Sequence, residues 1–423
     1  MPQGQRDTIY VLDYGSQYSH LIVRRIRELG IFAELVPHNF PLKKLSQSSG
    51  IILSGGPQNL SESDALRIDK KAFTLGVPIL GICYGLQLTA HELGGKVTAG
   101  KKREYGPVDI TVKENAPLMA GLPKKQRTWM SHGDQVTKLP KGFNVIASSL
   151  NCEYAAIADE KRKIFGLQFH PEVTHTEYGL EILKRFLKVT GAKDSWSMAD
   201  FIEEGVAKIR AQVGKDKAVC ALSGGVDSAV AATLVHKAIG KQLTCIYVDT
   251  GLMRAGETEQ IKKAFQGYQK MKLVVVKAEK EFLKALKGVN DPEKKRKTIG
   301  ELFIRLFERE AKKLGKVKWL VQGTLYTDAI TSGVSVGKTA AVIKSHHNVG
   351  GLPGKLGFKL IEPLRELYKD EVRKLGALLK LPKEITQRQP FPGPGLAVRI
   401  IGEVTKEKLE LLRAADAIVR EEI

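Results

Sequence analysis

The chain has 423 residues and a formal net charge of +21, with 43% hydrophobic and 27% charged residues. This length exceeds one ordinary hydrophobic core, so two or three domains are expected, and the composition is typical of a soluble globular protein. No apolar run approaches the length needed to cross a bilayer, and the opening residues, MPQGQRDTIYVLDYG, lack the apolar core of a secretory signal. We therefore expect a cytoplasmic chain with no membrane partner.

The cysteines and the positive charge exclude or disfavour other classes of protein. The four cysteines, Cys83, Cys152, Cys220 and Cys245, are widely spaced and form no CxxC pair. Such spacing indicates neither a disulfide framework nor a zinc site. The charge could serve nucleic acid, small polyanionic substrates or a solvated surface. Its densest runs, residues 101–103 and 294–297, contain no aromatic side chains to stack on bases, so nucleic-acid binding is disfavoured.

The first half of the chain alternates short apolar runs with amphipathic stretches. TIYVLD, IFAELVP, GIILSGGP and VPILGICYG read as strands, and IFGLQFH at residues 164–170 is a later one. SQYSHLIVRRIRELG and LQLTAHELGG have helical spacing. This alternation predicts a mostly parallel sheet covered by helices. The polar, turn-rich residues 189–201 predict a domain boundary.

A second alternating block begins at residue 217. AVCALS, QLTCIYVD, KLVVVKA and VKWLVQGT read as strands, separated by helices that include a long basic one. After Pro382 a proline- and glycine-rich elbow leads into QPFPGPGLAVRIIGEV. We expect the apolar part of that segment to be a strand and the residues after it to form a helix that reaches the end of the chain.

Cys83 has the sequence context of a nucleophile. It stands between two glycines, directly after the apolar run VPILGI and before a helix. A sharp strand-to-helix turn would expose the side chain, and the helix N-terminus would lower the pKa of the thiol and offer N–H groups to an oxyanion. A buried cysteine acting as a small apolar residue is the alternative, which the flanking glycines weaken.

A thiol nucleophile needs a base and a group that orients the base. FGLQFHPEV supplies His170 and, two residues later, Glu172, and this spacing places both side chains on one face of an extended segment. Glu172 could therefore fix the tautomer of His170. His91, His132 and His175 are less constrained, and we expect structural or substrate-contact roles for them.

GICYGLQ, LSGGP and FHPE together resemble the class I glutamine amidotransferases. The resemblance implies a flavodoxin-like domain in which Cys83 attacks the glutamine amide, His170 moves the proton and Glu172 orients His170. It also implies an oxyanion hole formed by Gly55, Gly56 and the N–H of Tyr84. Gln87 and the segment SHGDQV would line the glutamine pocket. The product of this half is ammonia, which needs an acceptor.

The segment SGGVDS in the second block predicts a phosphate-binding loop. It follows the strand AVCAL and opens a helix, so its N–H groups can form an anion nest. The residues assigned to ATP or pyrophosphate are Ser223, Gly224, Gly225, Val226, Asp227, Ser228 and Ala229. Asp227 could hold Mg²⁺, and Asp249, at the end of the next strand, could contact the nucleotide. A generic glycine turn is the alternative.

The loop lacks the lysine of a Walker motif, and SGGVDS instead resembles the loop of the N-type ATP pyrophosphatases. That family transfers AMP to an acceptor oxygen, so the loop would hold the leaving pyrophosphate. GVSVGKTA at residues 333–340 imitates a Walker loop, but three residues rather than four separate its glycines. We interpret it as a flexible loop on the substrate side.

An amidotransferase followed by an ATP pyrophosphatase resembles the glutamine-hydrolysing GMP synthetases. DTGLMR, EKKRKTIG, IKSHHNVGGLP and PFPGPGLAVRI are similar to segments of that family. The resemblance implies adenylation of XMP by ATP and displacement of AMP by ammonia, without a tightly bound organic cofactor. It implies a phosphate contact to XMP from Arg296, closure of residues 344–352 near the nucleotide, and a homodimer if the full C-terminal domain is present. The adjacent His346 and His347 are not expected to bind a metal.

The sequence departs from that family at three positions and at its end. Thr327 and Thr331 stand where a proline and a glutamate are usual, and Gln389 where histidine is common. The family continues into a dimerisation domain, whereas this sequence stops at Ile423 after the expected first strand and helix of that domain. If that is the true end, dimerisation and XMP binding should be weakened.

The predicted fold is α/β throughout. A flavodoxin-like amidotransferase domain would span residues 7–195, and a Rossmann-like ATP pyrophosphatase domain residues 196–388. Residues 389–423 would begin a small α+β dimerisation domain. Two other functions remain open: another glutamine-dependent adenylating amidoligase, and a non-catalytic basic scaffold.

Overall fold

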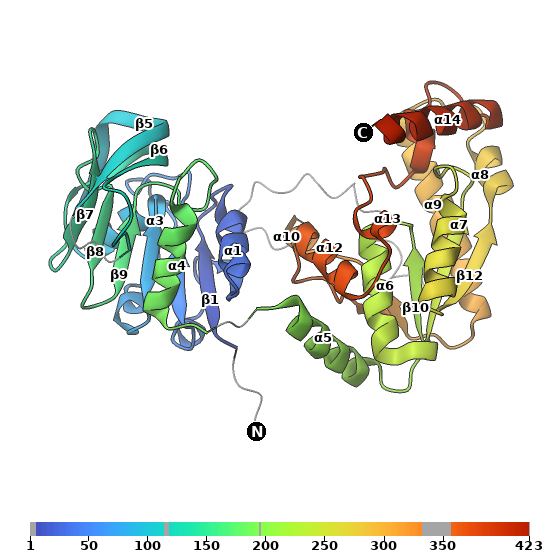
Figure 1. The fold of residues 1–423 in the computed structure, drawn as a ribbon, viewed down its shortest axis with the longest axis horizontal. Helices are drawn as coiled ribbons and strands as arrows, with labels where there is room; N and C mark the ends of the chain where they lie inside the picture. Colours follow the sequence, from blue (N-terminus) through green and yellow to red (C-terminus); the bar gives the residue numbers. More distant parts are fainter. Residues whose placement is uncertain (1–5, 114–117, 194–195, 332–356, 423) are drawn as a thin grey trace. The chain divides into compact units, whose positions relative to one another are not determined.

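The computed structural model describes residues 6–113, 118–193, 196–331 and 357–422 (Figure 1). The chain divides into two compact units, Met1–Ser197 and Met198–Ile423, and each is described by itself. The Walker-like residues 333–340 and residues 344–352, with His346 and His347, lie outside the described residues. Their predicted roles therefore stay predictions.

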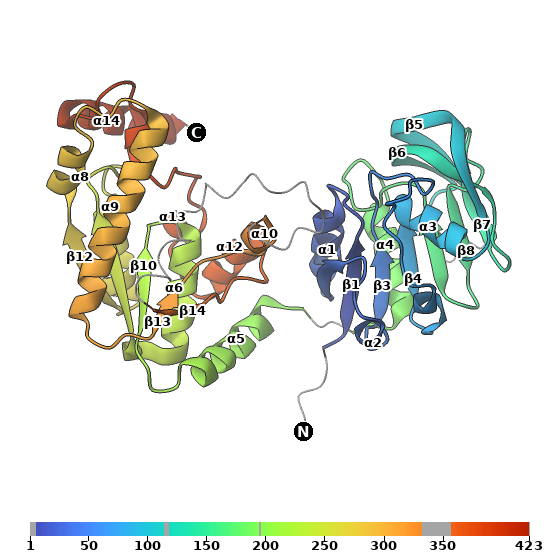
Figure 2. The ribbon, with the colours of Figure 1, turned by 180° about the vertical axis from the view of Figure 1, so that it is seen from behind.

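The first unit contains a parallel sheet that extends into an antiparallel one. Its parallel part has the order β2 (Phe32–Pro37), β1 (Thr8–Asp13), β3 (Gly50–Leu53), β4 (Ile79–Ile82), β9 (Ile164–Leu167), which is the flavodoxin order. β3, β4 and β9 are buried at every residue, as strands covered on both faces must be. α1 (Ser19–Glu28) and α4 (Gly179–Thr190) pack together on one face, and α3 (Tyr84–Glu92) lies on the other (Figures 1 and 2).

The antiparallel part was not predicted from the sequence. β8 (Ala156–Asp159), β7 (Asn144–Ser149), β5 (Lys96–Val112) and β6 (Lys125–Lys138) follow β9 in that order, each antiparallel to its neighbour. In β6 buried and more accessible residues largely alternate, which is typical of an antiparallel strand with one covered face. The expectation of a mostly parallel sheet therefore holds only up to β9.

The second unit contains a five-stranded parallel sheet with the Rossmann order. The strands follow one another as β12 (Lys272–Lys277), β11 (Leu243–Asp249), β10 (Ala218–Leu222), β13 (Trp319–Val321), β14 (Lys359–Ile361). α6 (Val226–Ile239) packs against α5 (Met198–Val213) and α12 (Lys369–Leu378) on one face, and α9 (Pro292–Lys313) covers the other (Figure 2). The strand order reverses between β10 and β13, and such a switch point is where ligands bind in open α/β sheets.

The remaining elements are short, apart from the C-terminal helix α14 (Lys406–Glu422). The α-helices are α2 (Leu42–Leu45), α7 (Glu257–Lys262), α8 (Glu279–Ala285), α10 (Tyr326–Thr331) and α13 (Lys383–Thr386). A π-helical turn spans Lys263–Tyr268. The 3-10 helices are η1 (Lys70–Thr74), η2 (Gly240–Gln242) and η4 (Gly395–Arg399).

The strand predicted after the proline-rich elbow is wrong. The apolar residues form η4 instead, and Leu396 and Ala397 are completely buried in the core of the second unit. The N–H of Leu396 donates to the carbonyl of Leu252 at 2.7 Å, and Gly395 turns the chain with a φ of +71°. A run of apolar residues satisfies both a strand and a buried turn, so hydrophobicity alone could not distinguish them.

Candidate functional site

Cys83 occupies a sharp turn between β4 and α3. Its φ of 51° and ψ of −105° lie outside the usual regions for a residue with a side chain. An added Cβ at Gly81 would lie 2.4 Å from the Gly85 carbonyl oxygen, and one at Gly85 would lie 2.2 Å from the Leu53 carbonyl oxygen. Both glycines are therefore required by close backbone packing, and the sharp turn predicted from the sequence is present. The predicted exposure of the side chain is wrong, because Cys83 is only 5% exposed.

His170 and Glu172 face each other although β9 ends before them. Nδ1 of His170 lies 2.7 Å from Oε1 of Glu172. The backbone of His170 is held at both ends, because its N–H donates to the Trp129 carbonyl at 2.9 Å and its carbonyl accepts from the Thr176 hydroxyl at 2.6 Å. The strand IFGLQFH is thus shorter than predicted, but the pairing of the two side chains is as expected.

The electrostatics of this group favour a charged imidazole. Burial alone would lower the pKa of His170, but the Glu172 carboxylate and hydrogen bonds to Cys83 and Glu172 raise that pKa well above its ordinary value of 6.5. Nδ1 carries the proton shared with Glu172, so Nε2 is the nitrogen available to the thiol. The structure brings together Cys83, His170 and Glu172 as a thiol, imidazole and carboxylate in sequence.

Gly55 and Gly56 lie beside this group. A Cβ on Gly55 would come 3.1 Å from Cε1 of His170, and one on Gly56 would come 2.6 Å from the Tyr14 carbonyl oxygen. Tyr84 is the first residue of α3, and N–H groups in the first turn of a helix have no partner within the helix. The position of these three residues is compatible with an oxyanion site, which stays a prediction.

Gln87 has a second, structural attachment that the sequence did not indicate. It is 4% exposed, and its Nε2 donates to the Asp134 carbonyl at 2.7 Å. Asp134 belongs to the SHGDQV segment on β6, and Ser131 of the same segment has its carbonyl 3.5 Å from Sγ of Cys83. α3 and β6 therefore meet beside the thiol, where the glutamine pocket was predicted.

The loop SGGVDS joins β10 to α6 at the switch point of the second sheet. Gly224 has a φ of +79°, and Gly225 is the N-cap of α6. The Ser228 hydroxyl donates to the Gly225 carbonyl at 3.0 Å, and it lies 3.1 Å from the Ser223 hydroxyl. Val226 and Ala229 are buried and anchor the loop to the core. These contacts hold a helix N-terminus open to an anion.

A lysine does reach this loop, from a distant part of the chain. Nζ of Lys369, the first residue of α12, lies 2.7 and 2.6 Å from the two carboxylate oxygens of Asp227. The two residues are 142 positions apart. Sequence reasoning missed Lys369 because no local motif marks it among the many lysines of the chain.

A further arginine and a glycine also close on the loop. Arg388 donates to the Gly224 carbonyl at 2.6 Å and pairs with Glu257 at 2.7 Å. Gly323 approaches the backbone of Asp227 so closely that a Cβ would lie 2.9 Å from its carbonyl carbon. The loop is therefore enclosed by segments from three other parts of the second unit.

A cleft of about 270 Å³ adjoins the loop through Glu257. Its lining includes Asp249 at the end of β11, Arg254, Glu279 and Arg413. β10 and β11 are neighbours in parallel register, so Asp249 and the loop lie at the same edge of the sheet. The structure thus places Asp249 at the same sheet edge as the loop, and its contact to the nucleotide stays a prediction.

The structure does not bring Arg296 to this cleft. Arg296 pairs with Glu293 one turn earlier on α9, at 2.7 and 2.8 Å, and this carboxylate raises the pKa of the guanidinium. Its neighbour Lys295 is completely buried and donates to the carbonyls of Ala397 and Ile400 at 3.3 and 2.7 Å. Part of this basic run is therefore structural, and the XMP contact of Arg296 stays a prediction.

Two family models match successive parts of the chain. A family model for class-I glutamine amidotransferases matches residues 10–189, and one for NAD synthase matches residues 196–297. The solved structure of a protein from Thermoplasma acidophilum, described as one subunit of a GMP synthase, is 32% identical and covers 45% of this chain and 96% of its own, with a TM-score of 0.41. Among the described residues, no helix is long and apolar enough to cross a membrane.

Two curated relatives are similar over nearly the whole chain. The GMP synthase [glutamine-hydrolyzing] of Caldicellulosiruptor saccharolyticus is 57% identical over 423 residues, which is 99% of this chain and 82% of the relative. The protein of the same name from Geobacillus kaustophilus is 56% identical over 421 residues, again 99% of this chain and 82% of the relative. The chain therefore belongs to the family of glutamine-hydrolysing GMP synthases.

Proposed function

We propose that the chain aminates XMP to GMP, with glutamine as the nitrogen donor and ATP cleaved to AMP and pyrophosphate. The observation that carries this proposal is the presence, on one chain, of a thiol–imidazole–carboxylate group and a phosphate loop with its own lysine. The identity of the acceptor, XMP, is inferred from the relatives named GMP synthase [glutamine-hydrolyzing], which match 99% of the chain. XMP, ATP and glutamine would be its small-molecule substrates.

In the first unit, Cys83 would attack the amide carbon of glutamine. His170, as a charged imidazole, would hold at Nε2 the proton that came from the thiol and would give it to the departing ammonia, while Glu172 holds the ring through Nδ1. The Tyr84 N–H, with the backbone at Gly55 and Gly56, would stabilise the oxyanion. Water would then hydrolyse the thioester and release glutamate.

In the second unit, an XMP oxygen would attack the α-phosphorus of ATP and pyrophosphate would leave. Ammonia would displace AMP from the adenylated XMP to give GMP. The N–H groups of the SGGVDS loop would hold the pyrophosphate, and Lys369 would supply the positive charge that a Walker lysine provides elsewhere. Adenylation turns a poor leaving group into a good one, which is why ATP is needed.

Mg²⁺ would accompany ATP in this site. Carboxylates and phosphate oxygens are the ligands that Mg²⁺ prefers, and Asp227 is a carboxylate at the mouth of the phosphate loop. Because both of its oxygens bind Lys369, Asp227 would exchange one of these contacts for the ion. The ion would neutralise phosphate charge when bound.

We also propose that the chain is cytoplasmic, since ATP and XMP are intracellular metabolites. We further propose that it forms a homodimer. Leu411, Ile418 and Val419 on α14 are 74%, 62% and 55% exposed, and Ile401 just before it is 95% exposed. Apolar side chains gathered at one end of a unit are typical of a contact surface. Light scattering on the purified chain tests this, and a monomer at all concentrations would contradict it.

One alternative acceptor has a specific observation behind it, because the NAD synthase model matches residues 196–297. The two functions differ in the molecule that is adenylated. We therefore expect AMP release to require XMP and not deamido-NAD, when each is supplied with ATP and glutamine. Release of AMP with deamido-NAD and none with XMP would replace the proposed function with this alternative.

A further inference from the structure

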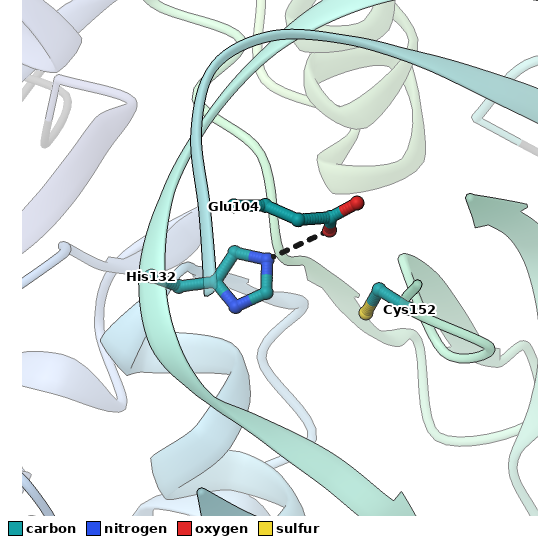
Figure 3. A group of neighbouring side chains, drawn as sticks. All are labelled: Glu104, His132 and Cys152. Carbon is teal, nitrogen blue, oxygen red and sulfur yellow. Dashed lines mark hydrogen bonds and ion pairs between the residues drawn. The ribbon is translucent and has the colours of Figure 1, made fainter. Parts of the chain in front are cut away.

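Three side chains able to ligate a metal meet in the interior of the first unit. Glu104 comes from β5, His132 from β6, and Cys152 from the turn between β7 and β8 (Figure 3). Each residue offers one ligand atom, and these three atoms lie within 4.8 Å of one another. They are a carboxylate oxygen, an imidazole nitrogen and the sulfur. Glu104 and His132 are each 4% exposed and Cys152 is completely buried. The mechanism proposed above uses none of the three.

The hydrogen bonds of His132 leave one contact unexplained. Nδ1 lies 3.0 Å from the Asp134 carbonyl, which can only accept, so Nδ1 carries the proton. In a neutral ring Nε2 is then a lone pair, yet it lies 3.1 Å from Oε2 of Glu104. A carboxylate oxygen also only accepts. Two facing acceptors need either a proton, carried by the ring or by the carboxyl group, or a metal ion bound by both.

The surroundings orient these groups as in a metal site. The other oxygen of Glu104, Oε1, accepts from the Ser149 hydroxyl at 3.0 Å and from the Asn151 amide at 3.4 Å. Oε2 therefore remains on the side of His132. A ligating histidine that donates its second N–H to a carbonyl, and a carboxylate held by further hydrogen bonds, are the usual outer contacts of bound metals.

The thiolate of Cys152 restricts which metal ion the three residues can bind. We propose that Glu104, His132 and Cys152 form a Zn²⁺ site. A thiolate, an imidazole and a carboxylate are ligands that Zn²⁺ accepts together, whereas Mg²⁺ and Ca²⁺ prefer oxygen alone. Binding forms a zinc–sulfur bond and releases the thiol proton of Cys152 to solvent.

The site lies beside a cleft, and an ion bound there would have a structural consequence. The cleft has a volume of about 460 Å³ and is lined by Ser149 and Asn151, the two residues that hold Glu104, and by Gln135. His132 shares β6 with Ser131, whose carbonyl faces Cys83. Zn²⁺ would therefore join β5, β6 and the turn at Cys152, and so fix one wall of the site around the thiol.

Zinc affinity, measured on metal-free protein in competition with a chromophoric chelator, tests the site. Cys83→Ala is the essential control, because Cys83, His170 and Glu172 are a second thiol–imidazole–carboxylate group. We expect about one Zn²⁺ per chain in the wild type and in Cys83→Ala, and affinity reduced by about 10- to 100-fold or more in Cys152→Ala. Co²⁺ should give a thiolate-to-metal absorption band in the first two proteins and none in the third.

Two further measurements keep the test valid if Cys152→Ala does not fold. Glu104→Gln keeps the shape of the side chain and removes its charge, so it should also weaken Zn²⁺ binding. Zn²⁺ should raise the unfolding temperature of the wild type and of Cys83→Ala but leave that of Cys152→Ser unchanged. Zinc binding that is lost in Cys83→Ala and retained in Cys152→Ser and Glu104→Gln would overturn the proposal, as would no binding at all. His132 and Glu104 would then be joined by a hydrogen bond alone.

Discussion

Cys83 has a positive φ, a conformation that costs free energy for a residue with a side chain. The surrounding backbone enforces it, because Gly81 and Gly85 allow β4, α3 and β3 to approach within contact of one another. The result is a thiol at a helix N-terminus with His170 beside it. The strained backbone conformation of Cys83 therefore fixes the position of its sulfur atom.

The charge state of His170 depends on Glu172, and this gives a prediction about pH. The pKa of His170 is raised above 6.5 in the folded chain, so protonated His170 stabilises the fold. That contribution is fully present below a pH of about 6.5 and is lost as the pH rises through the raised value. In Glu172→Gln the carboxylate is gone and burial prevails, so we expect the pKa of His170 to fall.

Proton NMR titration of the His170 ring in the wild type and in Glu172→Gln measures this difference. The stability gap between the two proteins should be widest at and below neutral pH and should narrow at high pH. Glutaminase activity should also fall in the variant, because the ring loses its orientation. Equal pKa values in the two proteins would contradict the assigned role of Glu172.

At the scale of elements, both sites lie where strands end and helices begin. β4 leads into α3 at Cys83, and β10 leads into α6 at the SGGVDS loop. Each arrangement needs glycine in a place where no side chain fits, and each leads directly into the N-terminus of a helix. The two units therefore share one structural device, a turn with glycines between a buried strand and a helix.

Gly85→Ala tests the packing at the first of these turns. The added methyl would meet the Leu53 carbonyl oxygen, so we expect a loss of about 1–3 kcal/mol in the stability of the first unit and a sharp fall in glutaminase activity. Gly205→Ala on α5 is the matched control, because its Cβ would meet only a side-chain atom of Leu234 at 3.6 Å. Alanine in that helix should stabilise by about 0.5–1 kcal/mol.

Thermal unfolding followed by circular dichroism distinguishes the two glycine variants. A lower unfolding temperature for Gly85→Ala and an unchanged or higher one for Gly205→Ala is the expected pattern. If Gly85→Ala unfolds like the wild type and keeps its glutaminase activity, the close approach of α3 to β3 is not required.

Lys369→Met tests the lysine that reaches the phosphate loop. Removing its charge should reduce ATP–pyrophosphate exchange by about 10- to 100-fold, since hydrogen bonds to charged groups contribute about 1.5–3 kcal/mol. Lys374→Met on the same helix is the control, because Lys374 is exposed on α12. Exchange should be normal in the control, and glutamine hydrolysis should persist in both. Normal exchange in Lys369→Met would remove this lysine from the mechanism.

The parts of the site that could be predicted from the sequence are those carried by short, continuous motifs. Cys83 between glycines, His170 with Glu172 two residues later, and the SGGVDS loop can each be recognised locally. The ion pair of Lys369 with Asp227 spans 142 residues, and only the folded sheet brings the two together. The cluster of Glu104, His132 and Cys152 likewise comes from three separate segments, so the spacing of cysteines gave no sign of it.

For the fold, too, the elements with a strong local sequence pattern could be predicted and the others could not. Runs such as GIIL and ILGI are buried throughout and predict parallel strands correctly. In the antiparallel extension, β5 and β6 are long and rich in charged residues, and buried and accessible residues largely alternate along β6, which gives a weaker signal. The segment LAVRII predicts a strand because it is apolar, but its first residues are buried in a 3-10 helix, and an apolar run alone does not distinguish the two.

At the scale of the whole molecule, one chain carries a group that can release ammonia and a loop that can release pyrophosphate. Neither unit alone makes an amination from glutamine, because the first unit supplies the ammonia and the second activates its acceptor. The proposed function therefore predicts a separation by mutation. Cys83→Ala should lose the use of glutamine and keep the use of free ammonium, whereas Asp227→Ala should lose adenylation and keep a glutaminase.

The most direct test of this account follows nitrogen from glutamine into the product. With XMP, ATP and glutamine labelled with ¹⁵N at its side-chain amide, we predict GMP that carries ¹⁵N at its 2-amino group, formed in equal amount with AMP. Cys83→Ala should form no labelled GMP, yet it should form GMP from added ammonium at a rate similar to the wild type. Glutamate release without any GMP, or AMP formation that does not depend on XMP, would contradict the account.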